Sequence, residues 1–326
     1  MKNLRTLCIL VLLLVINSCK EYNKNNRFLP PSTGGINTLI VVIDNDLWRG
    51  AVGDMVREFF ARPALSLMPE QPILSITQIP PQVFEGATTH SRAILYVQKD
   101  TLTVAHVKSN VYAQPQKVAV VKGITEEELM QGLENINHEA IQAFKQVEIA
   151  EAQKRFARSL NKENALQKTL GVNMTIPSAY RVGKQEKNFV WLDRQIPKGT
   201  MNIIAYAMPK DFFTTDSTLV HDIVAMRDSI GKKYIPGPYE NTYMITEKAF
   251  SPYVFPIQLQ DIKGAEVRGI WEMYGYPMAG PFLTYILNDI KNNRKLILEG
   301  FAFAPNTQKR DYMLELEAIL KTVQIP

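Results

Sequence analysis

The spacing of apolar side chains divides the first half of the chain into strands and helices. Short apolar and β-branched runs predict five strands, at residues 38–43, 73–79, 92–98, 102–107 and 117–121. Lys99 and Asp100 separate the third run from the fourth and predict a hairpin between them. From Trp48 to Phe59 the apolar residues recur at helical spacing, and Pro63 ends this pattern.

Two carboxylates precede this helix. Asp44 and Asp46 have the alternate spacing of a calcium loop, but Trp48 stands where such a loop needs an oxygen ligand. Aspartate is also a favoured N-cap residue, because its carboxylate accepts hydrogen bonds from the free N–H groups of the first turn. We therefore interpret the pair as helix caps.

A long helix is predicted in the middle of the chain. Thr125 and Glu128 have the spacing of a capping box, and the apolar residues that follow keep helical spacing toward Leu160. A second, shorter helix is predicted at residues 161–170, ended by Gly171. Residues 124–171 are therefore expected to be a helical connector.

The second half repeats the mixture of strands and helices. Strands are predicted at residues 172–176, 189–193, 201–207, 243–246, 266–274, 282–288 and 296–303. Helices are predicted from Asp216 to Gly231 and at residues 308–322. The predicted fold class is α+β, with two sheet-and-helix domains, residues 36–123 and 172–326, joined by a long helical segment.

The first residues have the pattern of a secretory signal. Lys2 and Arg5 precede an unbroken apolar run at residues 7–16, which is too short to span a bilayer. Residues 16–19, Ile-Asn-Ser-Cys, resemble a bacterial lipobox, which implies that residues 1–19 are signal peptide and lipobox and that Cys19 is lipidated. The alternative is an ordinary secreted protein. Residues 20–35 are polar and rich in Pro and Gly, so they are expected to be a flexible tether.

A lipidated Cys19 makes the membrane the first expected partner. The expected location is the cell envelope, at the outer membrane. Lys20 and Glu21 after the cysteine resemble a surface-export signal, so exposure on the cell surface is a further expectation.

Charge and cysteine content narrow the classes of function. Without Lys2 and Arg5 the chain has 35 basic and 32 acidic residues, about +3, and the two signs are interspersed. A nucleic-acid-binding protein carries a clustered basic surface, so we do not expect a nucleic-acid partner. The only cysteines are Cys8 and Cys19, so the remaining chain cannot form a disulfide within itself.

Known catalytic and cofactor motifs are missing from the sequence. His138 and Glu139 begin a zincin-like pattern, but Gln142 stands where the second histidine is needed. No nucleophile elbow or glycine-rich phosphate loop occurs. We therefore predict no metal and no cofactor, and the sequence favours a protein that is not an enzyme. Glu272 and Glu299 lie in neighbouring predicted strands, which leaves a hydrolase acting through carboxylates as an alternative.

The segment from Arg268 to Phe282 is rich in aromatic residues, Gly, Met and Arg, which binding surfaces favour. We expect a turn at residues 276–280 to border a groove for a ligand or partner. The candidate binding residues are Arg268, Trp271, Tyr274, Tyr276, Met278 and Phe282. The alternative is a strand, turn and strand whose aromatic side chains fill the core.

Short motifs along nearly all of the chain after Cys19 resemble a family of Bacteroidota lipoproteins classified as a domain of unknown function. The motifs are Asp44-x-Asp46-Leu-Trp48, Pro80-Pro81, Tyr234-Ile-Pro-Gly-Pro238, Arg268-Gly-Ile-Trp-Glu-Met273, Gly280-Pro-Phe282, Glu299-Gly-Phe301 and Lys309-Arg-Asp-Tyr312. The resemblance implies an envelope location and transfers no activity, cofactor or catalytic residue.

The sequence favours an envelope lipoprotein that binds another envelope protein or a small apolar ligand. The alternatives are the carboxylate hydrolase and a structural assembly factor of the outer membrane.

Overall fold

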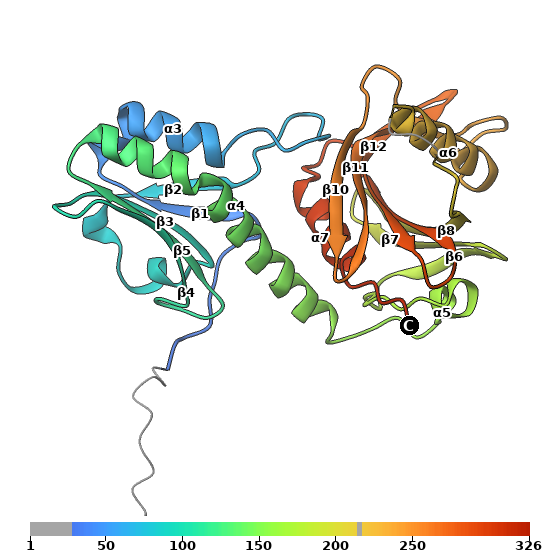
Figure 1. The fold of residues 1–326 in the computed structure, drawn as a ribbon, viewed down its shortest axis with the longest axis horizontal. Helices are drawn as coiled ribbons and strands as arrows, with labels where there is room; N and C mark the ends of the chain where they lie inside the picture. The colour runs from blue at the N-terminus through green and yellow to red at the C-terminus, as the bar shows by residue number, and fades with distance from the viewer. Residues whose placement is uncertain (1–27, 214–216) are drawn as a thin grey trace, which may run out of the picture.

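The computed structural model of the protein describes residues 28–213 and 217–326, which form two β-sheets with helices packed on them (Figure 1). A five-stranded sheet lies in the first half and an eight-stranded sheet in the second. One long helix, α4 (Glu126–Phe156), runs from the first to the second. The α+β fold with two sheet-and-helix domains joined by a long helical segment is confirmed. We call residues 28–157 the N-terminal domain and the described residues from 158 to 326 the C-terminal domain.

The sheet of the N-terminal domain is mostly parallel. Its order is β2 (Ser75–Ile79), β1 (Thr38–Val42), β3 (Ala93–Lys99), β5 (Lys117–Gly123) and β4 (Val104–Ser109). Only β4 runs antiparallel to its neighbour. Leu39 and Val41 of β1 pack against α4 and α3 (Ala51–Phe60). The other face carries a smaller apolar cluster, in which Phe84 packs against Val42, Ile94 and Val118. Phe84 lies between the short helices η2 (Pro81–Val83) and η3 (Gly86–His90).

The hairpin predicted at Lys99 and Asp100 is wrong, because β5 lies between β3 and β4. The N–H of Asp100 donates to Gly123 O at 2.9 Å, and its carboxylate pairs with Lys122 at 2.6 Å. These contacts fix the residues after β3 against the end of β5, so the chain does not turn back along β3.

The helix predicted from Trp48 to Phe59 is divided. A short helix α2 (Asn45–Arg49) ends at Gly50, which has extended backbone angles, and α3 follows. Asp44 occupies the N-cap position of α2, but its side chain makes no capping hydrogen bond. The side-chain capping predicted for Asp44 is therefore wrong.

The long helix α4 belongs to both hydrophobic cores. Thr125 caps it by accepting from the N–H of Glu128 at 3.3 Å, as the capping box predicts. Its apolar residues as far as Phe144 pack on the first sheet, whereas Ile149, Ala152 and Phe156 pack in the core of the C-terminal domain. The short helix α5 (Ala165–Leu170) follows and ends at Gly171, whose φ of 67° suits glycine.

The sheet of the C-terminal domain is antiparallel throughout. Its order is β10 (Tyr253–Leu259), β11 (Ile262–Tyr274), β12 (Tyr276–Asp289), β13 (Arg294–Phe303), β8 (Gly199–Pro209), β7 (Phe189–Ile196) and β6 (Arg181–Glu186), and β9 (Tyr243–Thr246) also pairs with β11. One face packs on α6 (Leu219–Tyr234) and the other on α5, α7 (Arg310–Leu320) and the end of α4.

Several predicted boundaries in this domain change. Residues 172–176 form no strand, and Asn173 makes only an isolated bridge to Gln324. The sequence does not predict the edge strands β6 and β10: β6 has a single large apolar side chain, Val182, and β10 contains Pro256, which argues against a strand except at an edge. The predicted helix start at Asp216 lies outside the described residues, and α6 begins at Leu219.

Residues 30–35, placed in the predicted tether, are part of the N-terminal domain. Ser32 and Thr33 hydrogen-bond to the backbone of Gln114 and His90, and Arg92 donates to the carbonyls of Gly34 and Gly35 at 2.8 and 3.0 Å. These bonds remove the freedom that a polar, Pro/Gly-rich composition predicts. Residues 20–27 of the predicted tether lie outside the described residues, as does Cys19.

Candidate interdomain binding site

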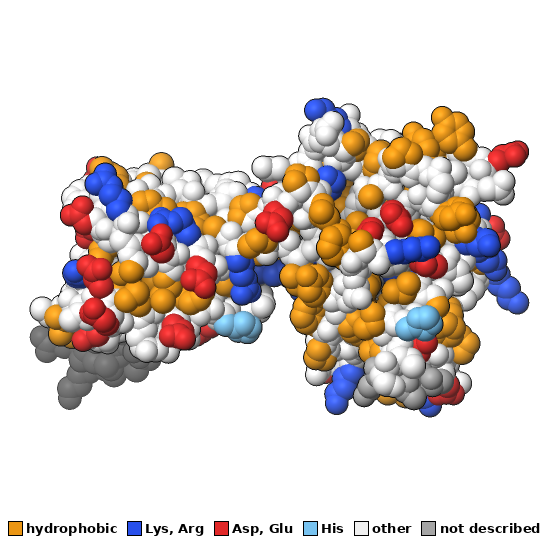
Figure 2. All heavy atoms as spheres, turned by 90° about the horizontal axis from the view of Figure 1, so that it is seen from above, with side chains coloured by type: hydrophobic (Ala, Val, Ile, Leu, Met, Phe, Trp, Pro, Cys, Tyr) orange, Lys and Arg blue, Asp and Glu red, His pale blue; other side chains and the backbone are white. Residues whose placement is uncertain are grey.

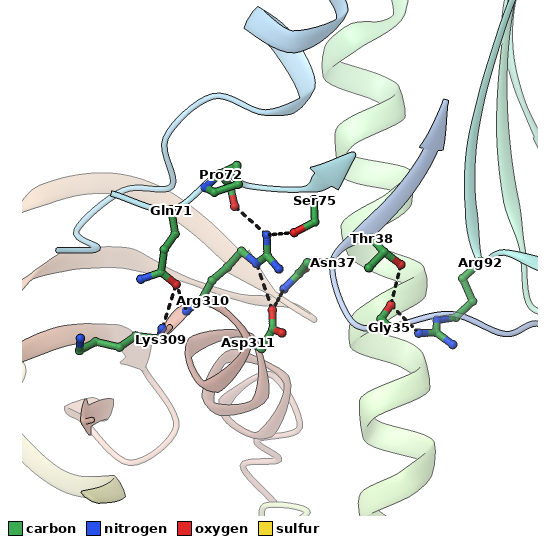
Figure 3. Close-up of polar contacts among 10 residues, drawn as sticks. All are labelled: Gly35, Asn37, Thr38, Gln71, Pro72, Ser75, Arg92, Lys309, Arg310 and Asp311. Atoms are coloured by element: carbon green, nitrogen blue, oxygen red, sulfur yellow. Dashed lines mark hydrogen bonds and ion pairs between the residues drawn. The ribbon is translucent and has the colours of Figure 1, made fainter. Parts of the chain in front are cut away.

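Side chains of the N-terminal domain hold the start of α7 (Figure 3). The helix has no cap from its own Lys309; instead the side-chain oxygen of Gln71 accepts from the backbone N–H groups of Lys309 and Arg310 at 2.8 and 3.0 Å. Because free N–H groups at a helix start need acceptors, Gln71 serves as a cap supplied by the other domain. Asn37 also donates to the carboxylate of Asp311 at 2.9 Å.

Beside this junction the two domains enclose a cavity of about 650 Å³. Its walls come from the loop after α3, from α4, from β10 to β12 and from α7. The apolar side chains in these walls include Ala64, Leu65, Leu67, Ile73, Leu74, Ile141, Phe255, Met313 and Leu314. Figure 2 shows a hollow between the domains with hydrophobic side chains along the facing edge of the C-terminal domain. The size lies in the range of pockets that bind small molecules.

A cluster of charged side chains lies in one wall of the cavity. The carboxylate of Glu317, on α7, is 2.7 Å from Arg268 of β11 and 2.8 Å from Lys145 of α4. Lys321 approaches the same carboxylate at 2.7 Å, and Arg268 also pairs with Glu266 at 2.6 Å. Four of these residues line the cavity, and Lys321 does not. Lys145 comes from the N-terminal domain, so the cluster is completed by both domains.

Burial and the neighbouring charges shift the pKa values of these groups in different directions. Burial alone would raise the pKa of Glu317, but Arg268, Lys145 and Lys321 outweigh it and hold that pKa well below its usual range. Burial lowers the pKa of Lys145 despite the nearby Glu317. For Arg268, burial opposes the charge, but the two carboxylates raise its pKa and keep it protonated. Burial, with Glu317 and Glu266, raises the pKa of the nearby Tyr285 well above its usual value.

Two family models divide the chain at the end of α4. A model described as "Domain of unknown function (DUF4837)" matches residues 159–322, just over half of the chain. The chain belongs to the DUF4837 family. A model described as "Domain of unknown function (DUF8532)" matches residues 32–157. In this DUF4837 protein, the cavity therefore lies between the two matched regions, with β10 to β12 and α7 in the first and α4 in the second.

Other comparisons add little. No curated protein matches the chain. A crystal structure of a protein from Bacteroides thetaiotaomicron is similar to 47% of this chain and 44% of that chain, with 9% sequence identity and a TM-score of 0.26. The chain thus matches less than half the length of that protein.

The six predicted binding residues occupy three different places. Arg268 lines the cavity. Phe282 borders it, but its ring lies on the α6 face against Arg227, and the residue is only 1% exposed. Trp271 is buried on the α6 face, where its indole N–H donates to the carbonyl of Ala302 at 3.3 Å. Tyr274, which is 51% exposed, stacks on Tyr243 with ring centroids 5.0 Å apart.

The remaining two residues lie at the start of β12. Tyr276 is partly buried against Tyr239, and Met278 packs against the core below α6. The turn predicted at residues 276–280 is wrong: the chain reverses at Gly275, whose φ is 75°, and residues 276–280 belong to β12. The six residues therefore do not form one surface, and Arg268 is the one whose side chain faces the cavity.

The two carboxylates considered for hydrolysis do not come together. Glu299 is 1% exposed and forms a double ion pair with Arg227 of α6, at 2.6 and 2.8 Å. Thr284 donates to the same carboxylate at 2.7 Å. Because side chains alternate along strands, the register places Glu272 on the opposite face of the sheet. This geometry removes the basis for a pair that shares acid–base work.

Of the charged cluster, the sequence predicted only Arg268. It missed Glu266, Lys321, Lys145 and Glu317, and the last two break an apolar pattern. Lys145 follows Phe144 on α4, and Glu317 stands between Leu316 and Ala318 on α7. A charged residue on the buried side of an amphipathic helix is a signal for a paired or functional charge. Within the described ranges no group of three or more His, Cys, Asp and Glu side chains is placed to hold a metal ion. None of the helices described is long and apolar enough to cross a membrane.

Proposed function

We propose that the protein is a lipid-anchored envelope protein that binds a small, mainly apolar ligand in the cavity between its domains. The observation that carries the proposal is the cavity of about 650 Å³, with apolar walls and a few converging charged groups. Such a combination is typical of ligand sites, in which apolar walls supply affinity and a few polar groups fix orientation.

The anchor is supported by the lipobox-like sequence that ends at Cys19. We expect labelled palmitate to be incorporated into the full chain in cells, and Cys19→Ala to abolish the label. The unlabelled variant should leave the membrane fraction, because several acyl chains hold a protein far more firmly than electrostatic contact alone. Undiminished label on Cys19→Ala would contradict the lipoprotein assignment.

The ligand site can be tested with a neutral photoreactive probe. Hexadecanol carrying a diazirine is added to the full chain in phosphatidylcholine vesicles, and labelled residues are mapped by mass spectrometry. The expected labels fall on residues that line the cavity, such as Ile141, Met313 and Leu314. The probe carries no charge, so this experiment tests only the apolar walls.

Two substitutions on one helix provide a matched pair. Gln142 and Gln146 are both exposed on α4, but only Gln142 lines the cavity. Gln142→Trp should fill the opening and reduce labelling of the cavity about tenfold, whereas Gln146→Trp should leave it unchanged. Labels outside the cavity, or equal effects of the two variants, would contradict the proposed site.

A further inference from the structure

The charged side chains that line the cavity carry one more positive than negative charge. Arg62, Lys145 and Arg268 contribute three cations, and Glu317 and Glu266 contribute two carboxylates. Arg310 also lines the cavity, but it is paired with Asp311. Both carboxylates and Arg268 are at most 16% exposed, so the imbalance is poorly screened by water. A single negative charge on a ligand would balance the charges that line the cavity.

Within the cluster around Glu317, Lys145 is the group that can receive this charge. Its side chain is 33% exposed and lines the cavity, and Glu317 is the one ion-pair partner that the described residues give it. An ammonium group has three N–H donors, so donors remain for a ligand after the contact with Glu317. Lys321 pairs with the same carboxylate but does not line the cavity.

The walls next to this charge are aliphatic and aromatic. Ile141 lies one helical turn before Lys145 on α4, and Phe255 of β10 is the cross-strand neighbour of Glu266. Phe255 is 40% exposed, so it offers apolar surface at the border of the cavity. A ligand that contacts both the walls and Lys145 must combine an apolar body with an acidic end.

We propose that the cavity binds monocarboxylic acids with a long aliphatic chain, with the carboxylate on Lys145 and Arg268 and the chain along the apolar walls. This inference rests on the proposed function and adds the chemical class of the ligand. A group with two negative charges, such as an alkyl phosphate dianion, overcompensates the single excess charge beside Glu317 and Glu266. A fatty alcohol can make the apolar contacts with the walls, but it leaves the excess positive charge uncompensated.

The test is competition in the same vesicles. Diazirine-labelled hexadecanoic acid is bound to the full chain, and unlabelled hexadecanoate, hexadecanol and hexadecyl phosphate are added in turn. Hexadecanoate should compete at least tenfold better than hexadecanol, and hexadecyl phosphate should compete less well than hexadecanoate. Shortening the acid should weaken it about fourfold for each buried methylene lost.

Lys145→Gln and Lys321→Gln form the matched pair for the charge. Both remove one cation from Glu317, but only Lys145 reaches the cavity. Lys145→Gln should reduce the affinity for hexadecanoate about tenfold and leave hexadecanol unchanged, while Lys321→Gln should change neither by more than twofold. Thermal unfolding of each variant verifies that it is folded.

The results separate the two proposals. If hexadecanol labels the cavity but hexadecanoate competes no better, or if both lysine variants lose affinity equally, the carboxylic-acid inference is overturned and the binding site remains. If no probe labels the cavity, the proposed function itself fails. If hexadecyl phosphate competes best, the ligand class is a phosphate ester and the inference is again overturned.

Discussion

Two buried Arg–Glu pairs lie on opposite faces of the same sheet, and they differ in what surrounds them. Arg227 and Glu299 are each 1% exposed, and both belong to the C-terminal domain. The carboxylate receives two bonds from Arg227 and one from Thr284, and Arg227 also donates to Thr246 at 2.6 Å. The guanidinium lies 3.4 Å from the ring centroid of Phe282. The two charges compensate each other, and both side chains are almost fully buried. We call this the closed pair.

The pair on the other face, Arg268 and Glu317, borders the cavity, and we call it the open pair. Arg268 and Glu317 have similar distances, but they share two lysines and a second carboxylate and border a cavity. The comparison shows that burial and a short distance do not distinguish a structural ion pair from a site. The two cases are distinguished by the net charge of the surrounding residues and by whether the pair borders a cavity.

The largest expected loss of stability comes from the closed pair. Arg227→Met leaves Glu299 buried without its cation, which costs about 3–5 kcal/mol of unfolding free energy. Urea denaturation measures the loss, and hexadecanol labelling of the cavity should persist wherever the variant is folded. The double variant Arg227→Met/Glu299→Leu should recover most of the loss. A single variant that loses less than about 1 kcal/mol would show that water reaches this pair.

Breaking the open pair should cost less. Glu317→Gln leaves three cations without their shared carboxylate, but Lys145 and Lys321 are 33% and 26% exposed and can be hydrated. We expect a loss of about 2–3 kcal/mol, below the full cost of an uncompensated buried charge. A loss equal to that of Arg227→Met in parallel urea titrations would erase the distinction between closed and open.

The same carboxylate makes stability depend on acid pH. The pKa of Glu317 is depressed in the folded protein, because its three cations outweigh burial, whereas the unfolded value is about 4.3. The contribution of Glu317 is therefore fully present above that unfolded value and declines as the pH falls below it. Unfolding free energies measured from neutral to strongly acid pH should converge for the native protein and Glu317→Gln. A constant difference would contradict the depressed pKa.

The smallest effects on stability are expected at the lysines. Lys145→Gln and Lys321→Gln each remove one of three cations around Glu317, and both side chains are partly hydrated, so each should cost no more than about 1 kcal/mol. The shift in melting temperature should be small for both. A large loss for Lys145→Gln alone would mean that its contact between the domains is structural rather than a place for ligand charge.

Local patterns in the sequence predicted much of the fold and little of the site. The boundaries of β9 and β1 and the cap of α4 follow from short-range signals at residues 243–246, 38–43 and 125–128. The sequence does not predict which strands lie next to β3, because contacts between distant parts of the chain place β5 between β3 and β4. Lys145, Arg268 and Glu317 meet only after both domains fold, and no short-range period carries that information.

The sharing of α4 has a consequence for how this protein can change by recombination. A chromosomal break between the regions matched by the two family models, near residue 158, separates the C-terminal domain from Ile149, Ala152 and Phe156. A transplanted C-terminal region thus lacks part of its own core, and the new neighbour must end in a helix with matching apolar residues. Shuffling of the two regions is restricted to partners that supply such a helix.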